Sequence, residues 1–122
     1  MSNNEKKSVE IRSWGTYEIL YQDEIVVVKK LVIHPGHRFS YQTHAERAER
    51  WVFIQGKGEV TLNDASISVT DGSMIEVLRG DKHRAKNTGT ENLIFIEVMT
   101  GHYDELDNVR LADDYGRGMS KE

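Results

Sequence analysis

The chain has 122 residues, 38% of them hydrophobic and 30% charged, which predicts one soluble globular domain with its own core. Its 16 basic and 20 acidic residues give a net charge of −4, which argues against a nucleic-acid-binding surface. Because there is no cysteine, disulfides and thiolate ligands are excluded, and any metal site must use nitrogen and oxygen atoms. No apolar run approaches the roughly 20 residues of a membrane span, and the polar start MSNNEKKS shows no signal peptide. We therefore expect a cytoplasmic protein without a membrane partner.

In chain order, residues 1–10 are expected to form a flexible leader, residues 11–117 a single domain, and residues 118–122 a flexible tail. Within the domain, short alternating or β-branched segments predict strands at residues 14–21, 24–33, 39–44, 49–55, 59–62, 67–70, 73–78 and 93–99. Turn signals separate them, among them Asn63-Asp64 and Asp71-Gly72. No window before residue 100 has a convincing helical period, so the fold class is all-β, a sandwich or barrel. The polar segment that begins at Gly101 could be a short helix, an edge strand or a cover over one mouth of the barrel.

Three potential metal ligands, Gln42, His44 and Glu49, fall within eight residues between two expected strands. Gln42 and His44 are two residues apart, so on a strand both side chains leave from the same face. His83 is a fourth candidate further along the chain. Two imidazoles and two oxygen donors suit zinc, iron, manganese, nickel or cobalt. The alternative is that these are ordinary packed or surface side chains.

Two spacings enclose these candidates: G-x5-Q-x-H-x4-E-x6-G from Gly36 to Gly56, and G-x5-L-x-G-x2-H-x3-N from Gly72 to Asn87. Together, with fifteen residues between them, they resemble the paired motifs of the cupin superfamily. Gln42 stands where most cupins have their first His, and Leu78 stands where Pro is usual. The resemblance implies a cupin jelly roll, that is, a double-stranded β-helix barrel whose interior holds the ligands.

A closer resemblance runs from about Arg12 to Arg117. The segments RSWGTYEIL, IHPGHRFSYQTHAERAERW, GDKHRAKNTGTENLIFIEVMTG and NVRLADDYGR are similar to motifs of type II mannose-6-phosphate isomerases. The same domain ends the bifunctional isomerase/mannose-1-phosphate guanylyltransferases, where Gln also replaces the first His. We expect a free-standing cupin domain of this isomerase type.

The resemblance implies one divalent metal ion, with zinc first and cobalt, manganese, nickel or iron as alternatives. It also implies that the chain forms a homodimer and takes a small sugar phosphate as its substrate. Arg47 matches an Arg implicated in sugar-phosphate recognition or catalysis, and Arg117 matches an Arg that would cover the barrel mouth. The implied metal ligands are Gln42, His44, Glu49 and His83.

The remaining site candidates come from the residues near the ligands. Arg38 and Arg50 are candidate anion ligands, although charged runs are usually solvated, and Tyr115 could hydrogen-bond a substrate or pin the tail. The family has a His at position 50, and an Arg cannot replace it in proton transfer, so Glu46 is the candidate base. Trp51 and Phe53 share the Glu49 face and are expected in the core rather than in a sugar-stacking platform.

The leading functional hypothesis is a metal-dependent isomerase that interconverts mannose 6-phosphate and fructose 6-phosphate through an enediolate. The altered positions Ala45 and Arg50 motivate an alternative, a non-catalytic cupin that binds a sugar or sugar nucleotide. A third hypothesis is an iron-dependent cupin oxygenase, which Gln42 disfavours because such enzymes usually offer more imidazole ligands.

Overall fold

The computed structural model describes residues 9–102, 107–115 and 120–121. These residues form twelve β-strands and no α-helix. The strands are β1 (Val9–Arg12), β2 (Gly15–Gln22), β3 (Val26–Ile33), β4 (Tyr41–His44), β5 (Arg47–Gln55), β6 (Gly58–Leu62), β7 (Ala65–Val69), β8 (Met74–Val77), β9 (His83–Asn87), β10 (Leu93–Gly101), β11 (Asn108–Ala112) and β12 (Ser120–Lys121). No helix among the described residues is long and apolar enough to span a bilayer.

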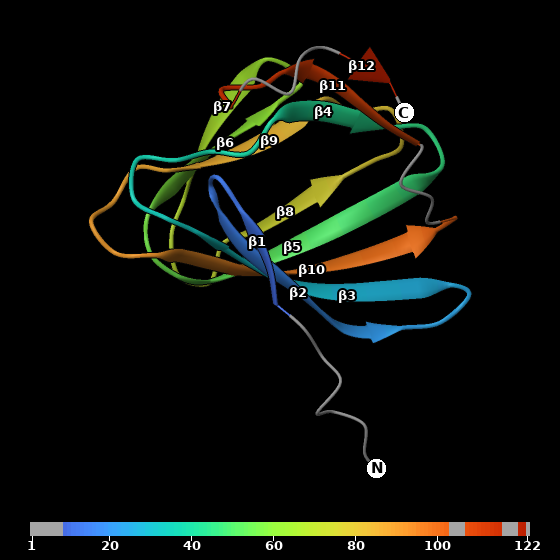
Figure 1. Ribbon diagram of the computed structural model, residues 1–122, viewed down its shortest axis with the longest axis horizontal. Helices are drawn as coiled ribbons and strands as arrows, with labels where there is room; N and C mark the ends of the chain where they lie inside the picture. The colour runs from blue at the N-terminus through green and yellow to red at the C-terminus, as the bar shows by residue number, and fades with distance from the viewer. Residues whose placement is uncertain (1–8, 103–106, 116–119, 122) are drawn as a thin grey trace.

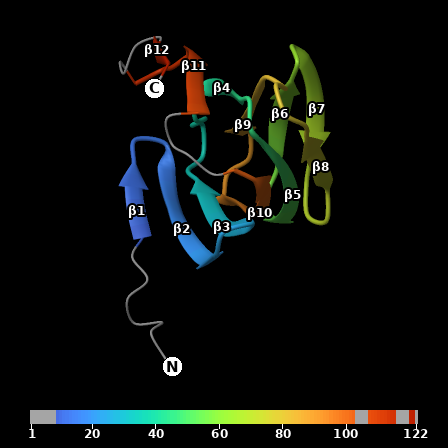
Figure 2. The same ribbon diagram turned by 90° about the vertical axis from the view of Figure 1, so that its right-hand side faces the viewer.

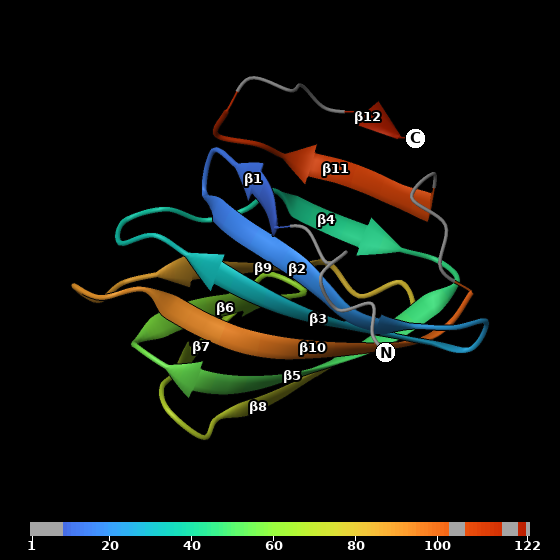
Figure 3. The same cartoon turned by 60° about the horizontal axis from the view of Figure 1, so that its bottom comes forward.

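The strands form two six-stranded antiparallel sheets, one in the order β1-β2-β3-β10-β5-β8 and the other in the order β12-β11-β4-β9-β6-β7. The sheets face each other as two layers (Figure 1), and the β1 edge of one lies on the same side of the molecule as the β11 edge of the other (Figures 2 and 3). From β3 to β11 the chain passes back and forth between the two layers, with the β6–β7 hairpin staying in one of them, as in a jelly roll. The predicted all-β, double-stranded β-helix fold is confirmed.

Each of the eight predicted strands is present, with ends that shift by up to two residues. The tail forms a strand, β11, which pairs with β4 on one side and β12 on the other. Sequence reasoning missed β9, because its residues are mostly polar although the strand is buried between β4 and β6. β1 begins inside the expected leader, and β12 lies inside the expected tail.

The β6–β7 hairpin shows how local chemistry sets the strand register. Asn63 and Asp64 have φ angles of 50° and 71°, and they connect the paired residues Leu62 and Ala65. Asn and Asp tolerate this left-handed conformation better than most residues, which suits a two-residue hairpin turn. The turn predicted at these two residues is confirmed.

One glycine is required by a close backbone contact at the start of β2. A Cβ atom on Gly15 would lie 1.9 Å from the carbonyl oxygen of Val32. Gly15 pairs with Ile33 across the β2–β3 ladder, so any side chain here would push β2 away from β3. Both strands contribute residues to the interior, and the glycine keeps them in register.

The core lies between the sheets and is built around aromatic rings. Trp51, Phe53 and Phe95 are each at most 1% exposed. The Phe53 and Phe95 ring centroids are 4.7 Å apart, and those of Trp51 and Phe95 are 4.9 Å apart. Phe53 is a core residue, as expected, while Trp51 also borders the cavity described below.

Candidate functional site

Strand alternation on β5 turns a row of chemically mixed side chains inward. Arg47, Glu49, Trp51 and Phe53 are buried, while the residues between them are more exposed. The inward row therefore passes from aromatic core to charged groups within one strand. This places Glu49 in the interior, at the end of the apolar core.

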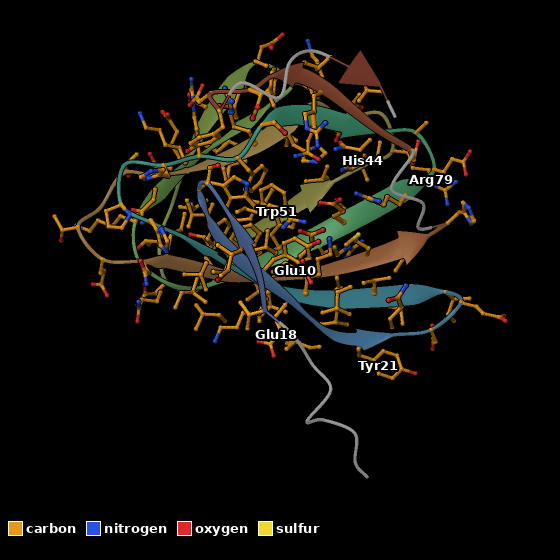
Figure 4. All side chains as sticks on the ribbon, in the orientation of Figure 1. Glu10, Glu18, Tyr21, His44, Trp51 and Arg79 are labelled. Atoms are coloured by element: carbon orange, nitrogen blue, oxygen red, sulfur yellow. The ribbon has the colours of Figure 1, made fainter. Side chains whose placement is uncertain are left out.

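The opposite sheet supplies two histidines that meet Glu49. His44 ends β4 and is 3% exposed, and His83 begins β9 and is 2% exposed. Gln42 on β4 lies directly opposite His83 on β9. Figure 4 shows His44 and Trp51 between the two layers, in contrast to Tyr21, which projects outward from the edge of the molecule.

His44, Glu49 and His83 form a compact cluster that could hold a metal ion. One potential ligand atom from each residue lies within 4.8 Å of the others. His44 Nε2 is 3.4 Å from Glu49 Oε2, and His83 Nε2 is 4.0 Å from Glu49 Oε1. His83 Nδ1 lies 3.0 Å from the carbonyl oxygen of Asp81, which can only accept a hydrogen bond. Nδ1 therefore carries a proton, and Nε2 is the nitrogen that faces Glu49, the arrangement found in many metal sites.

The electrostatics of the cluster match the protonation states that metal ligands need. Burial lowers the pKa of His44 to about 3, so this imidazole is neutral near pH 7. Burial alone would raise the pKa of Glu49, but His83, His44 and Arg47 beside it, together with the Trp51 N–H, outweigh burial and lower the pKa to about 2. A neutral imidazole and an ionised carboxylate can bind a cation without first losing protons.

Gln42 offers an oxygen to the same interior space. Its amide nitrogen donates to the backbone oxygen and the hydroxyl of Ser40, at 3.2 and 3.1 Å. The amide oxygen is therefore the atom left to face the cavity that Gln42 lines. The structure brings His44, Glu49 and His83 together and places Gln42 beside His83. The donor set of two nitrogens and two oxygens fits a borderline divalent metal.

Arg47 contacts two of the same ligand atoms. Its Nη2 donates to His44 Nε2 at 3.0 Å, and its Nε donates to Glu49 Oε2 at 3.4 Å. His44 Nδ1 must then carry the proton, and it has no hydrogen-bond partner among the described residues. A metal ion at these two atoms requires the guanidinium to turn away from them. Arg47 lines the cavity, so it can turn toward a ligand there.

The cavity has a volume of about 280 Å³ and opens between the two sheets. This is close to the small end of ligand pockets, about 300 Å³, so it suits a monosaccharide better than a nucleotide. Its apolar lining consists of Trp14, Leu31, Phe39 and Trp51. Its polar lining consists of Arg12, Tyr17, Lys29, Ser40, Gln42, His44, Arg47, Glu49, His83, Glu97, Asn108 and Arg110.

Several of the residues expected at the site do not line this cavity. Arg38 donates to both carboxylate oxygens of Asp114, at 2.7 and 3.1 Å. Arg50 lies on the outward face of β5 and donates to Glu76 at 2.7 Å. The ring of Tyr115 packs against the core and stacks on His37, so its body pins the chain near the tail.

Of the two remaining candidates, Glu46 lies away from the described site. Glu46 is exposed, in the turn between β4 and β5, and its backbone N–H donates to Asp107 at 2.9 Å. Asp107 also accepts from Ala45 at 3.0 Å and so fixes the turn that precedes Arg47. Arg117 lies outside the described residues.

Sequence reasoning missed four charged residues that line the cavity: Arg12, Lys29, Glu97 and Arg110. For two of them a signal was present. Lys29 lies in the inward row of β3 between Val27 and Leu31, and Glu97 lies in the inward row of β10. A single charge in an otherwise apolar alternating row indicates an inward-facing polar group.

Glu97 is a second buried carboxyl group, next to Glu49. It is 6% exposed and pairs in register with Lys29 on β3 and Trp51 on β5. Burial and the neighbouring charge of Glu49 raise its pKa to about 8, although Lys29 acts in the opposite direction. Glu97 is therefore protonated near pH 7 while Glu49 is ionised. The two carboxyls differ because Glu49 has the cations and the Trp51 N–H beside it.

Comparison with known proteins gives matches over most of the chain. Residues 2–114 match the family described as Mannose-6-phosphate isomerase C-terminal. The xanthan biosynthesis protein XanB of Xanthomonas campestris pv. campestris (strain B100) is 38% identical over 107 residues, covering 87% of this chain and 23% of XanB. A mannose-1-phosphate guanylyltransferase of Klebsiella pneumoniae is 35% identical with the same coverage. The chain thus spans less than a quarter of the length of these relatives.

Solved structures resemble the fold at much lower identity. The Streptomyces protein PAC13, in a structure with uridine, has a TM-score of 0.79 at 12% identity, covering 93% of this chain and 90% of that one. The cupin domain of Schizosaccharomyces pombe Cnp3 has a TM-score of 0.72 at 17% identity, covering 83% and 73%. These likenesses concern the fold, which is that of a cupin.

The metal cluster generates the first prediction. We expect His44→Ala and His83→Ala to weaken zinc or cobalt binding by more than about 100-fold, since loss of an outer-shell partner alone costs 10–100-fold. His37→Ala is the matched control, because His37 does not belong to the cluster. Metal content after dialysis, measured by elemental analysis, and the cobalt absorption spectrum report the result. Equal metal retention by all three variants would show that the cluster is not the metal site.

The buried Glu97 generates a pH prediction for the metal-free protein. Below pH 4.5 both folded and unfolded states hold this proton. Between pH 4.5 and 8 only the folded state does, so stability falls as pH rises through that window. We expect Glu97→Gln to remove part of this loss and to raise the unfolding free energy at pH 8 by about 2 kcal/mol.

Urea unfolding at pH 5 and pH 8 measures the effect, with Glu18→Gln as the control because Glu18 lies on β2 and does not line the cavity. If the two variants respond equally to pH, Glu97 does not titrate abnormally in the folded state.

Proposed function

We propose, from the premise that the chain belongs to the Mannose-6-phosphate isomerase C-terminal family, that it is a metal-dependent aldose–ketose isomerase of sugar phosphates. The substrate pair would be mannose 6-phosphate and fructose 6-phosphate. The observation that carries the proposal is the buried cluster of His44, Glu49 and His83 in the wall of a cavity of monosaccharide size. A sugar bound there would lie beside both the cluster and several basic side chains.

The proposed reaction moves a proton between two adjacent carbons of the sugar, and a divalent metal would supply Lewis-acid polarisation of the carbonyl. The protein must supply a group that accepts and returns the proton. Among the described residues, Glu97 is the one carboxyl besides Glu49 that lines the cavity. We therefore place proton transfer on Glu97 in preference to the exposed Glu46. A divalent cation held beside Glu49 would lower the pKa of Glu97 and so favour the ionised carboxylate, the form that can accept a proton.

Arg47 would contribute charge rather than proton transfer. Its guanidinium is 7% exposed and borders the cavity beside the ligand atoms. A fixed positive charge near the reacting carbons stabilises negative charge that develops on the sugar oxygens. Arg47 contacts His44 and Glu49 with two different nitrogens of its guanidinium. A lysine at this position would keep the positive charge but could not make both contacts in the same geometry.

A sugar-binding module without catalysis is the second candidate. It is favoured by the placement of Arg50 and Glu46, which both lie away from the cavity. Binding of a sugar phosphate without turnover would then use the same cavity and the same basic residues. The cavity volume of about 280 Å³ disfavours a whole sugar nucleotide inside it.

The isomerase proposal is tested with protein loaded in turn with zinc, cobalt, manganese and nickel. We expect conversion of mannose 6-phosphate to fructose 6-phosphate that disappears with chelator and returns on adding metal. Glu97→Gln should lower kcat by at least about 100-fold, the usual contribution of a general acid or base. Glu46→Gln is the matched control and should keep wild-type kcat.

Proton exchange separates the two candidate functions. Incubation of mannose 6-phosphate in heavy water should introduce deuterium at C2 if the chain is an isomerase, and NMR detects it. Saturable binding with no exchange in any metal form would reject the isomerase in favour of the binding module.

We also propose that two copies of the chain pair through the outer face of the β1–β8 sheet. On β10 the inward residues alternate with Ile94, Ile96 and Val98, which face outward and are half-buried. In register, Ile96 lies between Lys30 of β3 and Val52 of β5. This apolar row of β10, flanked by Lys30 and Arg50, favours coverage by another sheet.

The same outer face carries both signs of charge in the Arg50–Glu76 ion pair. A surface with both signs can match itself across a two-fold axis, so a second copy is the partner we propose. Light scattering after gel filtration should give the mass of two chains for the wild type. Ile96→Glu should give one chain, while Ser68→Glu on β7 of the other sheet should leave the dimer intact. A wild type that stays monomeric at high micromolar concentration would contradict this.

A further inference from the structure

Lys29 occupies a position that strand alternation reserves for apolar side chains. In the inward row of β3, Val27, Leu31 and Ile33 are 2%, 7% and 0% exposed. Lys29 belongs to this row and lines the cavity. Lys29 therefore brings a basic side chain to the wall of the cavity, in register with Glu97 of β10.

A second cation reaches the same place from β1. The ring of Tyr17 on β2 has Lys29 Nζ 4.6 Å from its centroid and Arg12 Cζ 5.1 Å from it. Arg12 also donates to the Tyr17 hydroxyl at 3.2 Å. Both side chains line the cavity, as does Tyr17. The two cations and the tyrosine hydroxyl thus gather at one wall of the cavity, where their combined positive charge would attract an anionic group.

Three other arginines near the site are paired with carboxylates. Arg38 is paired with Asp114, Arg50 with Glu76, and Arg47 with Glu49 in the cluster. Arg12 has a partner too, Glu10, but that contact is 3.7 Å long and exposed, so it is weak. Arg12 and Lys29 thus bring two basic groups to the β1–β3 wall of the cavity, while Arg110 reaches the cavity from β11.

We propose that Lys29 and Arg12, together with the Tyr17 hydroxyl, form the subsite that binds the phosphate group of a sugar phosphate. The inference rests on the proposed function for its substrate class. Two cations and a hydroxyl donor can contact several oxygens of one phosphate dianion, and charge-assisted hydrogen bonds to such oxygens are strong. The phosphate at this wall would hold the other end of the sugar toward His44, Glu49 and His83.

The placement makes this subsite selective. An unphosphorylated hexose has no group to satisfy the two cations, so it should bind much more weakly than its phosphate. The subsite is also separate from the metal ligands in sequence and in strand, since β1 to β3 contribute none of them. Changes in it should therefore leave metal binding intact.

Neighbouring lysines on β3 provide the matched test. Lys29 faces inward, whereas Lys30 faces outward and pairs in register with Glu18 and Ile96. Calorimetric titration of the zinc-loaded protein with mannose 6-phosphate should give a Kd at least about tenfold higher for Lys29→Met, the loss of one charged hydrogen bond. Lys30→Met should stay within about twofold of the wild type. Lys29→Arg should recover much of the affinity.

Arg12→Gln gives an independent variant, because Arg12 lies on an exposed edge strand and its loss should not disturb the core. It too should weaken mannose 6-phosphate binding, and inorganic phosphate should displace the sugar phosphate from the wild type. Zinc content and urea midpoint, measured for each variant, should match the wild type.

Equal affinities for the Lys29→Met and Lys30→Met variants would overturn the subsite, and so would a wild type that binds mannose 6-phosphate no better than mannose. Failure of the isomerase proposal looks different. In that case binding still depends on Lys29 and Arg12, but no deuterium enters at C2 of the sugar.

Discussion

The burial of the Glu49 carboxylate is the constraint on which the site depends. The side chain is 3% exposed, and a lone charge so deep in a protein would be strongly unfavourable. Its Oε1 accepts from Trp51 Nε1 at 2.9 Å, while its Oε2 lies 3.4 Å from both Arg47 Nε and His44 Nε2. Because Trp51 packs on Phe95 in the core, the carboxylate is anchored to the aromatic core. The aromatic core therefore positions the metal cluster directly.

This constraint extends across the sheet as a band of inward polar groups. Lys29 on β3 pairs with Glu97 on β10, and Glu97 pairs with Trp51, two residues from Glu49 on β5. β3 and β10 each contribute one ionisable residue, and β5 contributes Arg47 and Glu49, to rows that are otherwise apolar. All four residues line the cavity. A ligand in that cavity would therefore contact basic groups as well as the cluster of His44, Glu49 and His83.

The sequence alone was enough to predict the features that depend on short spacings between residues. Gln42 and His44 are two residues apart on β4, and Glu49 is the third residue of β5, so local alternation was enough to predict that they face one interior space. Lys29 and Arg12 were missed because their meeting on Tyr17 depends on the β1–β2 and β2–β3 registers. Strand β9 was missed because its residues are mostly polar, although the strand is buried between β4 and β6.

The basic residues illustrate the limit of sequence reasoning further. Arg50 is next to Glu49 in sequence, but strand parity turns it to the opposite face of β5. Arg38 is neutralised by Asp114, which is 76 residues away in the chain, and no short motif reveals such a pair. Arg47 is two residues from Glu49 and so shares its face. Which arginine reaches the cavity was thus decided by parity and by distant partners rather than by proximity to the ligands.

Arg47 links the metal cluster to the ligand cavity in a way that follows from its contacts. The guanidinium donates to His44 Nε2 and Glu49 Oε2, the atoms that a metal ion would use. Arg47 and a metal ion therefore compete for these atoms, and either of them balances the negative charge of Glu49. Once turned away, Arg47 adds a positive charge to the cavity that it lines. An anionic ligand gains from that charge, so metal and sugar phosphate should each favour the binding of the other, because such coupling is reciprocal.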